Sequence, residues 1–570
     1  MPNACRYAAT LLCAPIALWF TACTTAPTAD ALRSACPSLS GQTIPAARIG
    51  LPSGDATVAS AALVPAGAAA VANSALTPAT PEYCKVLGSI APRDPAAQRI
   101  QFQLNLPTQW NGKALQYGGG GFNGVLVTGL APLRDAAPGD ALPIARGYAT
   151  YGTDSGHQAS ASPPTDPGAF AQNDEMLENF AFASYKKVKD VAAQLMQRHY
   201  GRAPQRVYYF GGSEGGREGL TMAQRFPADY DGIVSVVPVV NWTGLFHAFV
   251  RHELPQFSDW LDAGKTPLIA RAVNDACDAL DGLADGVVNN YLACQSRVDL
   301  QRLRCPDGRD AGLQCLSDAE LALLRSAHTP YTFTFPLANG LTHYPAWLWG
   351  HEDSLDGPSA PSLVRWVTGT AAPTVPPQPG TAATQWLYGS NWIRHAIARD
   401  AAFDVRGYRP EAFAARVQHT SALVDSTHPD LSAFFARGGK LIVRENAADR
   451  AQSPLMGIDY VNAVVQRLGQ SAVNAGLRLY VSPASTHTGN ARSVTDQSPV
   501  PTMVDLLDPL DRWVGSGTPP PDALVQTVKA ALPPHDVRAS RPMCRYPGYP
   551  HYTGGDRLQA GSYACRPSQR

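Results

Sequence analysis

The stretch from Arg206 to Pro238, RVYYFGGSEGGREGLTMAQRFPADYDGIVSVVP, runs from a hydrophobic segment through glycines into a segment of helical character. Ser213 stands between Gly211 and Gly215 in a Gly-x-Ser-x-Gly pattern, which is typical of a sharp strand-to-helix turn that exposes a nucleophilic hydroxyl. Glycines suit this turn because neighbouring side chains would block the approach to the hydroxyl. The alternative is a glycine-rich turn with an incidental serine. The strand before it and the helix after it favour the nucleophile.

A serine nucleophile needs a base, and the base needs a carboxylate that orients it. On this type of turn the chain order is serine, acid, histidine. His487 in SPASTHTGN follows the predicted strand LRLYVSP, and Asp449 in ENAADRAQSP follows the predicted strand KLIVREN. The main competing base is His157, which precedes the serine, and the competing acid is Asp459, which lies in a predicted helix. We therefore predict a triad of Ser213, Asp449 and His487.

The developing oxyanion needs two backbone N–H groups. The residue after the nucleophile, Glu214, supplies the first in this arrangement, and the glycine run Gly118 to Gly121 ends an earlier predicted strand and offers the second. We predict that Gly121 is this second donor, with Gly120 as the alternative. A phosphate-binding loop is excluded because no Gly-Lys-Ser/Thr follows the glycines.

The order of predicted elements indicates an α/β protein. Strands IQFQLNLP, KALQY, GYATYGT and RVYYF alternate with the helical segment FAFASYKKVKDVAAQLMQRHYG, which predicts a mostly parallel sheet. The pattern fades between Trp242 and Ala436 and returns at GGKLIVREN. We predict a catalytic domain over residues 23–240 and 437–570 and an inserted domain over residues 241–436, and we assign no structure to residues 53–82.

The chain has 570 residues, too many for one compact core, and its formal net charge is +0. The absence of a basic stripe argues against a nucleic-acid partner.

The first 22 residues are typical of an export signal, with Arg6 before an apolar run that is too short to span a membrane. The run ends in FTAC, which is close to a lipoprotein box, so Cys23 is a candidate for lipid anchoring, with simple secretion as the alternative. Eight cysteines then remain in the exported chain, and an even number in an oxidising compartment predicts four disulfides. Pairing between neighbours is the simplest connectivity: Cys36 with Cys84, Cys277 with Cys294, Cys305 with Cys315, and Cys544 with Cys565.

The predicted insertion contains an acidic loop, CDALDGLADGVVNN. Asp278, Asp281 and Asp285 lie within eight residues, and glycines between them would let the carbonyls of Leu283 and Val287 join the carboxylates. Hard oxygen donors in a tight loop favour Ca²⁺. The alternative is an acidic turn without an ion.

With these residues in place, the chain resembles the tannase and feruloyl esterase family, which also contains mono(2-hydroxyethyl) terephthalate hydrolases. The resemblance rests on GGGGFNG, GYATYGTDSGH, YYFGGSEGGREGL, FPADYDGIVSVVP, CDALDGLADGV and DPLDRWVGSGTPP. It implies an α/β-hydrolase fold with a large inserted lid domain, a structural calcium in that lid and no organic cofactor. It also supports the triad and the four disulfides, and it implies small esters of aromatic acids as substrates.

The resemblance further implies that Arg399 and Phe403 contact the carboxylate and the ring of a terephthalate monoester, with Trp386 as another substrate contact from the same segment. The alternative is that these are ordinary lid residues. Family members usually carry bridged cysteines just before the nucleophile and just after the histidine, where this chain has Gly212 and Thr488. We expect a working triad that is held by packing and hydrogen bonds alone.

The sequence therefore predicts a secreted or lipid-anchored serine ester hydrolase for aromatic acids. The alternatives are a non-catalytic binding protein on the same fold, or a lipase or peptidase. The sequence does not indicate an oligomeric state.

Overall fold

The computed structural model describes residues 27–72, 75–159 and 166–568. The predicted export signal and Cys23 lie outside this part of the chain. Within it, no helix is both long and apolar enough to cross a membrane.

The described residues form one mixed sheet of twelve strands. Six neighbouring strands in its centre run parallel to one another, and the strands on either side pair antiparallel. In spatial order the strands are β1 (Thr43–Ile44), β2 (Ala56–Val64), β5 (Tyr83–Ile90), β6 (Ile100–Pro107), β8 (Ala149–Thr153), β7 (Lys113–Tyr117), β9 (Arg206–Gly212), β10 (Gly232–Val236), β13 (Lys440–Asn446), β14 (Leu477–Ser482), β16 (Val537–Arg545) and β15 (Ala523–Lys529).

Helices cover both faces of this sheet, because successive side chains of each buried strand point to opposite sides. Tyr209 of β9 packs in the cluster that contains α4 (Glu214–Arg225) and α12 (Pro454–Leu468). Its neighbours Tyr208 and Phe210 pack in another cluster, with α14 (Leu507–Ser516). The edge strands pack against α1 (Ala29–Ala35) and α3 (Ser184–Tyr200). Smaller helices of this part are α2 (Asp174–Glu178), α11 (Ser432–Ala436) and α13 (Gln470–Gly476).

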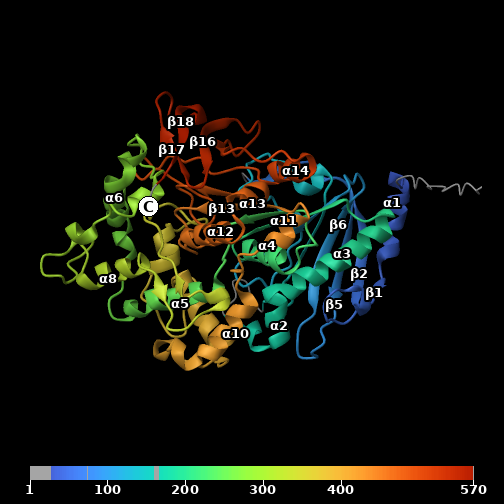
Figure 1. Cartoon of the computed structure of the whole chain (residues 1–570), viewed down its shortest axis with the longest axis horizontal. Helices are drawn as coiled ribbons and strands as arrows, with labels where there is room; N and C mark the ends of the chain where they lie inside the picture. The colour runs from blue at the N-terminus through green and yellow to red at the C-terminus, as the bar shows by residue number, and fades with distance from the viewer. Residues whose placement is uncertain (1–26, 73–74, 160–165, 569–570) are drawn as a thin grey trace, which may run out of the picture.

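Between β10 and β13 the chain adds no strand to the main sheet over its described length, and it forms the helical region at the left and bottom of Figure 1. One buried cluster joins this region to the sheet, since α5 and α9 residues pack with residues of β9 and α4. Its elements are α5 (Trp242–Glu253), α6 (Thr266–Cys277), α7 (Tyr291–Cys294), α8 (Asp318–Ala327), β11 (Tyr331–Thr332), β12 (His343–Tyr344), α9 (Thr384–Trp392) and α10 (Ala414–Val424).

The predicted α/β class is confirmed, and each strand quoted from the sequence forms. The predicted long helix begins later than its apolar pattern, because a π-helical turn over Asn179–Ala183 precedes α3. Gly201 ends α3 in the left-handed conformation, with φ 72°. Residues 53–82, left open above, contain β2 and, next to residues 73–74, the short strands β3 (Ala70–Ala72) and β4 (Ala75–Thr77).

The four disulfides join neighbouring cysteines as predicted: Cys36–Cys84, Cys277–Cys294, Cys305–Cys315 and Cys544–Cys565. The last of these joins β16 of the main sheet to β18 (Tyr563–Pro567), which forms a separate two-stranded sheet with β17 (Gly548–Tyr552).

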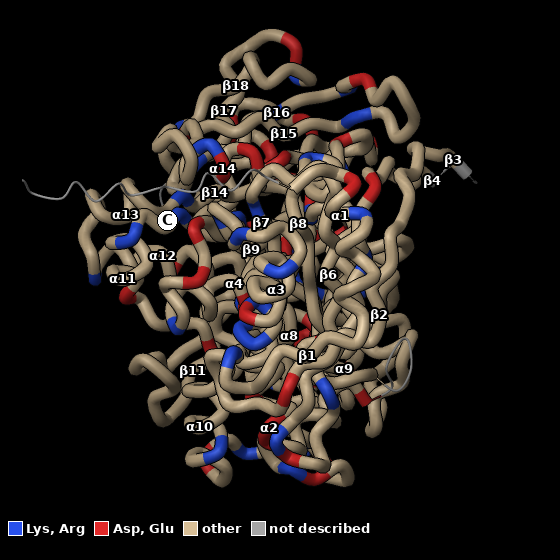
Figure 2. Tube along the Cα trace, turned by 90° about the vertical axis from the view of Figure 1, so that its right-hand side faces the viewer, with Lys and Arg blue, Asp and Glu red and all other residues tan. Residues whose placement is uncertain are grey.

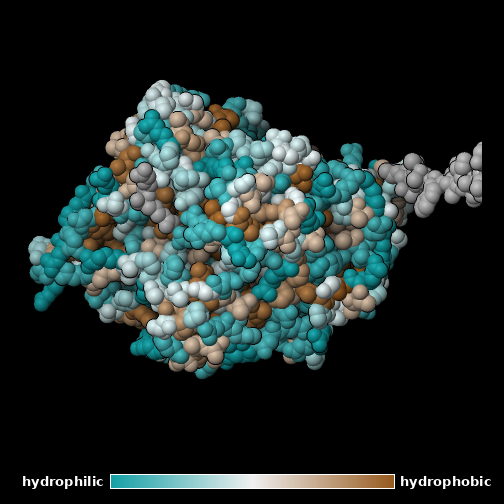
Figure 3. Space-filling view, in the orientation of Figure 1, coloured by the Kyte–Doolittle hydropathy of each residue, from teal (hydrophilic) through white to brown (hydrophobic). Residues whose placement is uncertain are grey.

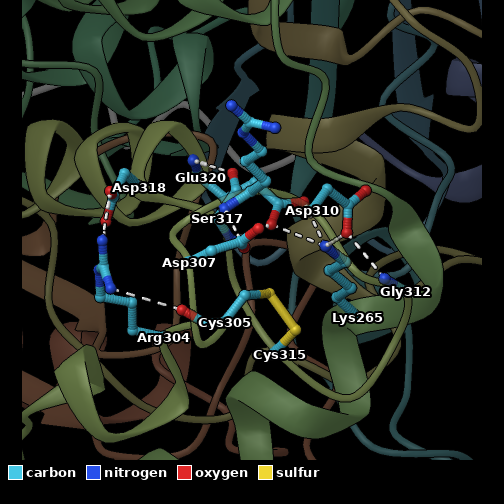
Figure 4. Close-up of a disulfide and its surroundings, with 11 residues drawn as sticks. Lys265, Arg304, Cys305, Asp307, Asp310, Gly312, Cys315, Ser317, Asp318 and Glu320 are labelled. Carbon is cyan, nitrogen blue, oxygen red and sulfur yellow. Dashed lines mark hydrogen bonds and ion pairs between the residues drawn. A yellow bond between two sulfur atoms is a disulfide. The ribbon is translucent and has the colours of Figure 1, made fainter.

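A second restraint accompanies the Cys305–Cys315 disulfide (Figure 4). The buried ammonium of Lys265 donates to Asp310 Oδ1 and to both carboxylate oxygens of Glu320, each at 2.7 Å. Glu320 also caps the start of α8 through the backbone N–H of Ser317, at 2.8 Å. The disulfide therefore closes the loop between these cysteines, and the ion pair of Asp310 with Lys265 fastens that loop to the start of α6.

The surface is mixed in charge and polarity. Figure 2 shows basic and acidic residues interspersed along the chain, without a single-sign stripe. Figure 3 shows a mostly hydrophilic face on which apolar residues occur in small separate spots. This distribution agrees with the balanced composition.

Candidate active site

The turn between β9 and α4 presents the serine. Ser213 has φ 61° and ψ −122°, a backbone conformation that non-glycine residues adopt only when their surroundings impose it. A Cβ on Gly211 would collide with the carbonyl group of Gly215, and a Cβ on Gly215 would lie 2.9 Å from the carbonyl carbon of Gly118. The two glycines of the motif are therefore required by close approach of backbone to backbone.

The side chains of the predicted triad meet. His487 Nε2 lies 3.0 Å from Ser213 Oγ, and His487 Nδ1 lies 2.7 Å from Asp449 Oδ2. Asp449 is fully buried, and its other oxygen accepts the backbone N–H groups of Ala451 at 2.7 Å and Gln452 at 3.1 Å. The three residues follow β9, β13 and β14, so they gather at the carboxyl ends of neighbouring parallel strands.

This arrangement fixes the roles of the two imidazole nitrogens. An ionised carboxylate only accepts hydrogen bonds, so Nδ1 of His487 donates to Asp449. In the neutral imidazole Nε2 is then the acceptor, and it faces the Ser213 hydroxyl. The geometry is that of a general base poised to remove the hydroxyl proton.

Gly121 and Glu214 lie around the same cavity as Ser213. Glu214 is the first residue of α4, where backbone N–H groups lack helical partners, and Gly121 has φ 58°. Gly120 lines a different cavity, and its N–H donates to Asn123 Oδ1. The positions therefore favour Gly121 over Gly120 as the second oxyanion donor.

Two residues that no sequence motif indicated, Glu218 and Tyr209, hold the glycine loop. Glu218, fully buried in α4, accepts the N–H of Gly119 at 3.1 Å and the side-chain amide of Asn123 at 2.7 Å. The hydroxyl of Tyr209 donates to the same carboxylate. In the sequence, the feature that could have predicted this contact is the acidic residue Glu218, five positions after the nucleophile.

The side chain of Glu214 forms a buried ion pair with Arg217. Arg217 Nε donates to its two oxygens at 2.9 and 2.8 Å, and both side chains are fully buried. Burial works to raise the pKa of Glu214, and the charge and hydrogen bonds of Arg217 oppose that shift. Arg217 also donates to the carbonyls of Ala181 and Val424, each at 2.8 Å. The first turn of α4 is therefore anchored from both sides.

His157, the competing base, lies elsewhere. Its ring stacks on Phe170 with centroids 3.9 Å apart, and burial lowers its pKa to about 4. It lines a separate cavity of about 490 Å³, together with Asn123 and Gln158. Tyr388 borders both this cavity and the one at Ser213.

The cavity at Ser213 is lined mainly by aromatic and aliphatic side chains, but it is small, at about 30 Å³. Besides Ser213 and the two oxyanion residues, its lining consists of Val239, Trp242, Leu245, Phe246, Phe249, Trp366, Tyr388 and Ala451. The lining from α5 and α9 comes from the inserted region, as expected of a lid.

The predicted acyl contacts need correction, because Arg399, Phe403 and Trp386 do not line this cavity. Trp386 and Phe403 border another cavity of about 230 Å³, and the indole N–H of Trp386 donates to the carbonyl of Thr374 at 2.8 Å. Arg399, which has a left-handed backbone at the end of a π-helical turn, pairs with Asp174. These side chains therefore have other partners in the structure than an acyl group at Ser213.

The acidic loop is buried. Asp278 accepts the N–H groups of Gly286 at 2.9 Å and Val287 at 3.1 Å, and Asp285 pairs with Arg541 at 2.9 Å. Asp281 is fully buried, and burial raises its pKa to about 7. Across the described ranges, no three His, Cys, Asp or Glu side chains are arranged to hold a metal by themselves. A cation here would need backbone carbonyls as well, so the calcium site remains a prediction.

A mixed sheet with a parallel centre, covered on both faces, with a strained serine turn and an acid and a histidine after later strands, defines an α/β hydrolase. The prediction of a mostly parallel sheet holds for its six central strands alone. The comparisons with known proteins agree. Residues 84–566 match the family model described as tannase and feruloyl esterase.

Similar proteins include an uncharacterized esterase of Agrobacterium fabrum, 36% identical, with 93% of this chain and 92% of the relative covered. Mono(2-hydroxyethyl) terephthalate hydrolase of Piscinibacter sakaiensis is 31% identical, with 85% of each chain covered. Among solved structures, feruloyl esterase B from Aspergillus oryzae aligns with a TM-score of 0.73 at 22% identity, over 94% of this chain and 100% of the other. The chain belongs to the tannase and feruloyl esterase family and is a carboxylic ester hydrolase.

Proposed function

We propose that the protein is a serine esterase that cleaves esters of aromatic acids through an acyl-enzyme. Ser213 Oγ attacks the ester carbonyl while His487 takes its proton, and Asp449 stabilises the imidazolium. The N–H groups of Gly121 and Glu214 receive the oxyanion. His487 then protonates the leaving alcohol, and water releases the acid by the same steps in reverse. The hydrogen-bonded contact of His487 with both Ser213 and Asp449 carries this proposal.

The apolar, aromatic lining beside Ser213 supports an aromatic acyl group, because offset and edge-to-face ring contacts add to apolar burial. The present volume of about 30 Å³ is much smaller than the ~150 Å³ of an engineered cavity that binds benzene. A ring can therefore enter only if a lining side chain moves. Tyr388 is the side chain shared with the 490 Å³ cavity, so its movement would open a path of sufficient size.

The relatives supply the substrate classes to test, since their names include feruloyl esterase and mono(2-hydroxyethyl) terephthalate hydrolase. The experiment is steady-state hydrolysis of methyl gallate, methyl ferulate and mono(2-hydroxyethyl) terephthalate by the wild type and by Ser213→Ala. We expect turnover of at least one ester and none by the variant. Absence of turnover of all three esters by the wild type would contradict the proposal.

We further propose a structural Ca²⁺ in the acidic loop, held by the carboxylates of Asp278, Asp281 and Asp285 and the carbonyls of Leu283 and Val287. The loop holds three buried carboxylates, of which Asp285 pairs with Arg541, and Asp285 Oδ1 has no hydrogen-bond partner in the described structure. Such a donor set suits a hard cation. It would balance the charge of the loop and stabilise the inserted region.

Export of the chain is also proposed. Four disulfides support folding in an oxidising compartment. Mass spectrometry of the mature N-terminus tests whether cleavage precedes Cys23 and whether that residue is acylated.

A further inference from the structure

Both polar groups of one peptide unit, between His487 and Thr488, are bound by charged side chains of opposite sign. Arg134 donates from its guanidinium to the carbonyl oxygen of His487. Asp356 Oδ1 accepts the N–H of Thr488 at 2.9 Å. A cation on the carbonyl and an anion on the N–H both match the peptide dipole, and charge-assisted hydrogen bonds are stronger than neutral ones. We call this arrangement the charged clamp.

The clamp joins two distant parts of the chain to the histidine loop. Arg134 lies between β7 and β8 of the sheet region, and Asp356 lies in the inserted region between β10 and β13. The loop that carries the imidazole is therefore held from both sides of the active site.

Asp356 restrains the imidazole in a second way. Its Oδ2 accepts the indole N–H of Trp366 at 2.6 Å, and the Trp366 ring meets the His487 ring edge-to-face, with centroids 5.3 Å apart. Asp356 is 1% exposed, and burial alone would raise its pKa; the neighbouring His487 charge and the hydrogen bonds from Thr488 and Trp366 lower it instead. A single buried carboxylate thus fixes the backbone after His487 and the ring beside it.

Arg134 reaches the histidine loop through space left by a glycine. A Cβ on Gly212 would overlap the Arg134 side chain, so this path requires glycine just before the nucleophile. On the other side, Thr488 Oγ1 accepts the N–H of Gly357 at 2.8 Å. Gly212 and Thr488 are the two positions at which the sequence departs from the family pattern.

We infer that Arg134 and Asp356 are positioning residues that keep the His487 imidazole within hydrogen-bonding distance of Ser213 and Asp449. This inference rests on the proposed serine mechanism. Neither residue lines the cavity at Ser213. Asp356 does bond Trp366, which lines that cavity, whereas Arg134 bonds the carbonyl of His487. Loss of the Arg134 contact should therefore lower the reactivity of the serine and leave substrate affinity nearly unchanged.

The test uses the full-length protein and the variants Asp356→Asn, Arg134→Gln and their combination. Asp353→Asn is the matched control, because Asp353 lies in the same loop but bonds Gln497 at 3.2 Å, away from the His487–Thr488 peptide. The measurements are kcat and KM for the best ester of the panel, the rate of Ser213 labelling by a fluorophosphonate, and the melting temperature.

We expect each single variant to lower kcat and the labelling rate in parallel by about tenfold or more, because small misplacements of a catalytic group are costly. KM of Arg134→Gln should change less than about twofold, because Arg134 does not line the cavity at Ser213. The control should retain kcat and labelling rate within about twofold. The double variant should lose less than the product of the single effects, because both residues hold the same peptide.

Several outcomes would overturn the inference. One is an active wild type whose two single variants keep kcat and the labelling rate; another is an increase in KM alone or a lower melting temperature alone. If Asp356→Asn does not fold, the kcat and labelling rate of Arg134→Gln test the inference, because Arg134 is only half-buried. An inactive wild type with unlabelled Ser213 would instead overturn the proposed function, and the inference with it.

Discussion

Replacing Asp449 by asparagine should disable the base without disturbing the fold, and the structure determines how. One oxygen of Asp449 accepts the N–H groups of Ala451 and Gln452, so the amide oxygen of the asparagine must take that side. The NH₂ group then faces His487 Nδ1, where the carboxylate oxygen lies now at 2.7 Å. Two donors cannot face each other, so Nδ1 becomes the acceptor and Nε2 carries the proton. A protonated Nε2 cannot accept the proton of Ser213.

The size of the effect follows from this change of tautomer. In a serine protease triad the same substitution lowers kcat by about 10⁴, which corresponds to about 5.5 kcal/mol of barrier. We expect a loss of this order in kcat, little change in KM, and an equally slow reaction of Ser213 with a fluorophosphonate. The melting temperature should stay close to that of the wild type, because both backbone hydrogen bonds to residue 449 remain.

Asp459→Asn is the control, since Asp459 was the competing acid in the sequence and lies in α12, outside the triad. It should retain kcat within about twofold. An Asp449→Asn variant with kcat within tenfold of the wild type would refute the tautomer argument. A strong loss of kcat in Asp459→Asn, with none in Asp449→Asn, would instead identify Asp459 of α12 as the acid of the triad.

Further predictions concern the clamp, the core and the acidic loop. Gly212→Ala should lower kcat as much as Arg134→Gln does, because its Cβ displaces the Arg134 side chain. In the double variant Gly212→Ala should cause little further loss of kcat, and independent losses in this double-mutant cycle would contradict the prediction. Arg217→Met should lower the free energy of unfolding, measured by urea denaturation, by about 3–5 kcal/mol, because it leaves the fully buried Glu214 without its cation. An unchanged urea concentration at the unfolding midpoint would contradict this prediction. Burial raises the pKa of Asp425 to about 6, so between pH 4 and 6 the unfolded chain releases a proton that the folded protein keeps, and stability should fall with rising pH by up to about 3 kcal/mol. Asp425→Asn should make that part of the stability–pH profile flatter, and identical profiles would count against the assignment. A chelator should lower the melting temperature if the acidic loop holds Ca²⁺. An unchanged melting temperature would contradict the proposed calcium site.

The sequence was sufficient wherever local backbone chemistry decides the structure. The glycines around Ser213 can be read from the motif because only a residue without a side chain allows the contact of Gly211 with Gly215. The strands before Asp449 and His487 follow from short apolar runs, and chain order then assigns the acid and the base. The substrate contacts of Arg399, Phe403 and Trp386 were expected from the family resemblance, and these side chains do not line the cavity at Ser213, because a family pattern does not show how the inserted region packs.

The amino-acid order by itself determined central strands of the sheet, the serine turn and the members of the triad, because periodicity and steric limits act between residues close along the chain. The antiparallel pairing of the strands on either side was not predicted. Only the tertiary structure decided which aromatic side chains surround Ser213, that Glu218 holds the glycine loop, and that Arg134 and Asp356 meet at the His487–Thr488 peptide. These contacts join residues far apart in sequence, and they depend on how the inserted region packs against the sheet. No local pattern encodes that packing, because it results from the shapes and charges of all the surfaces together.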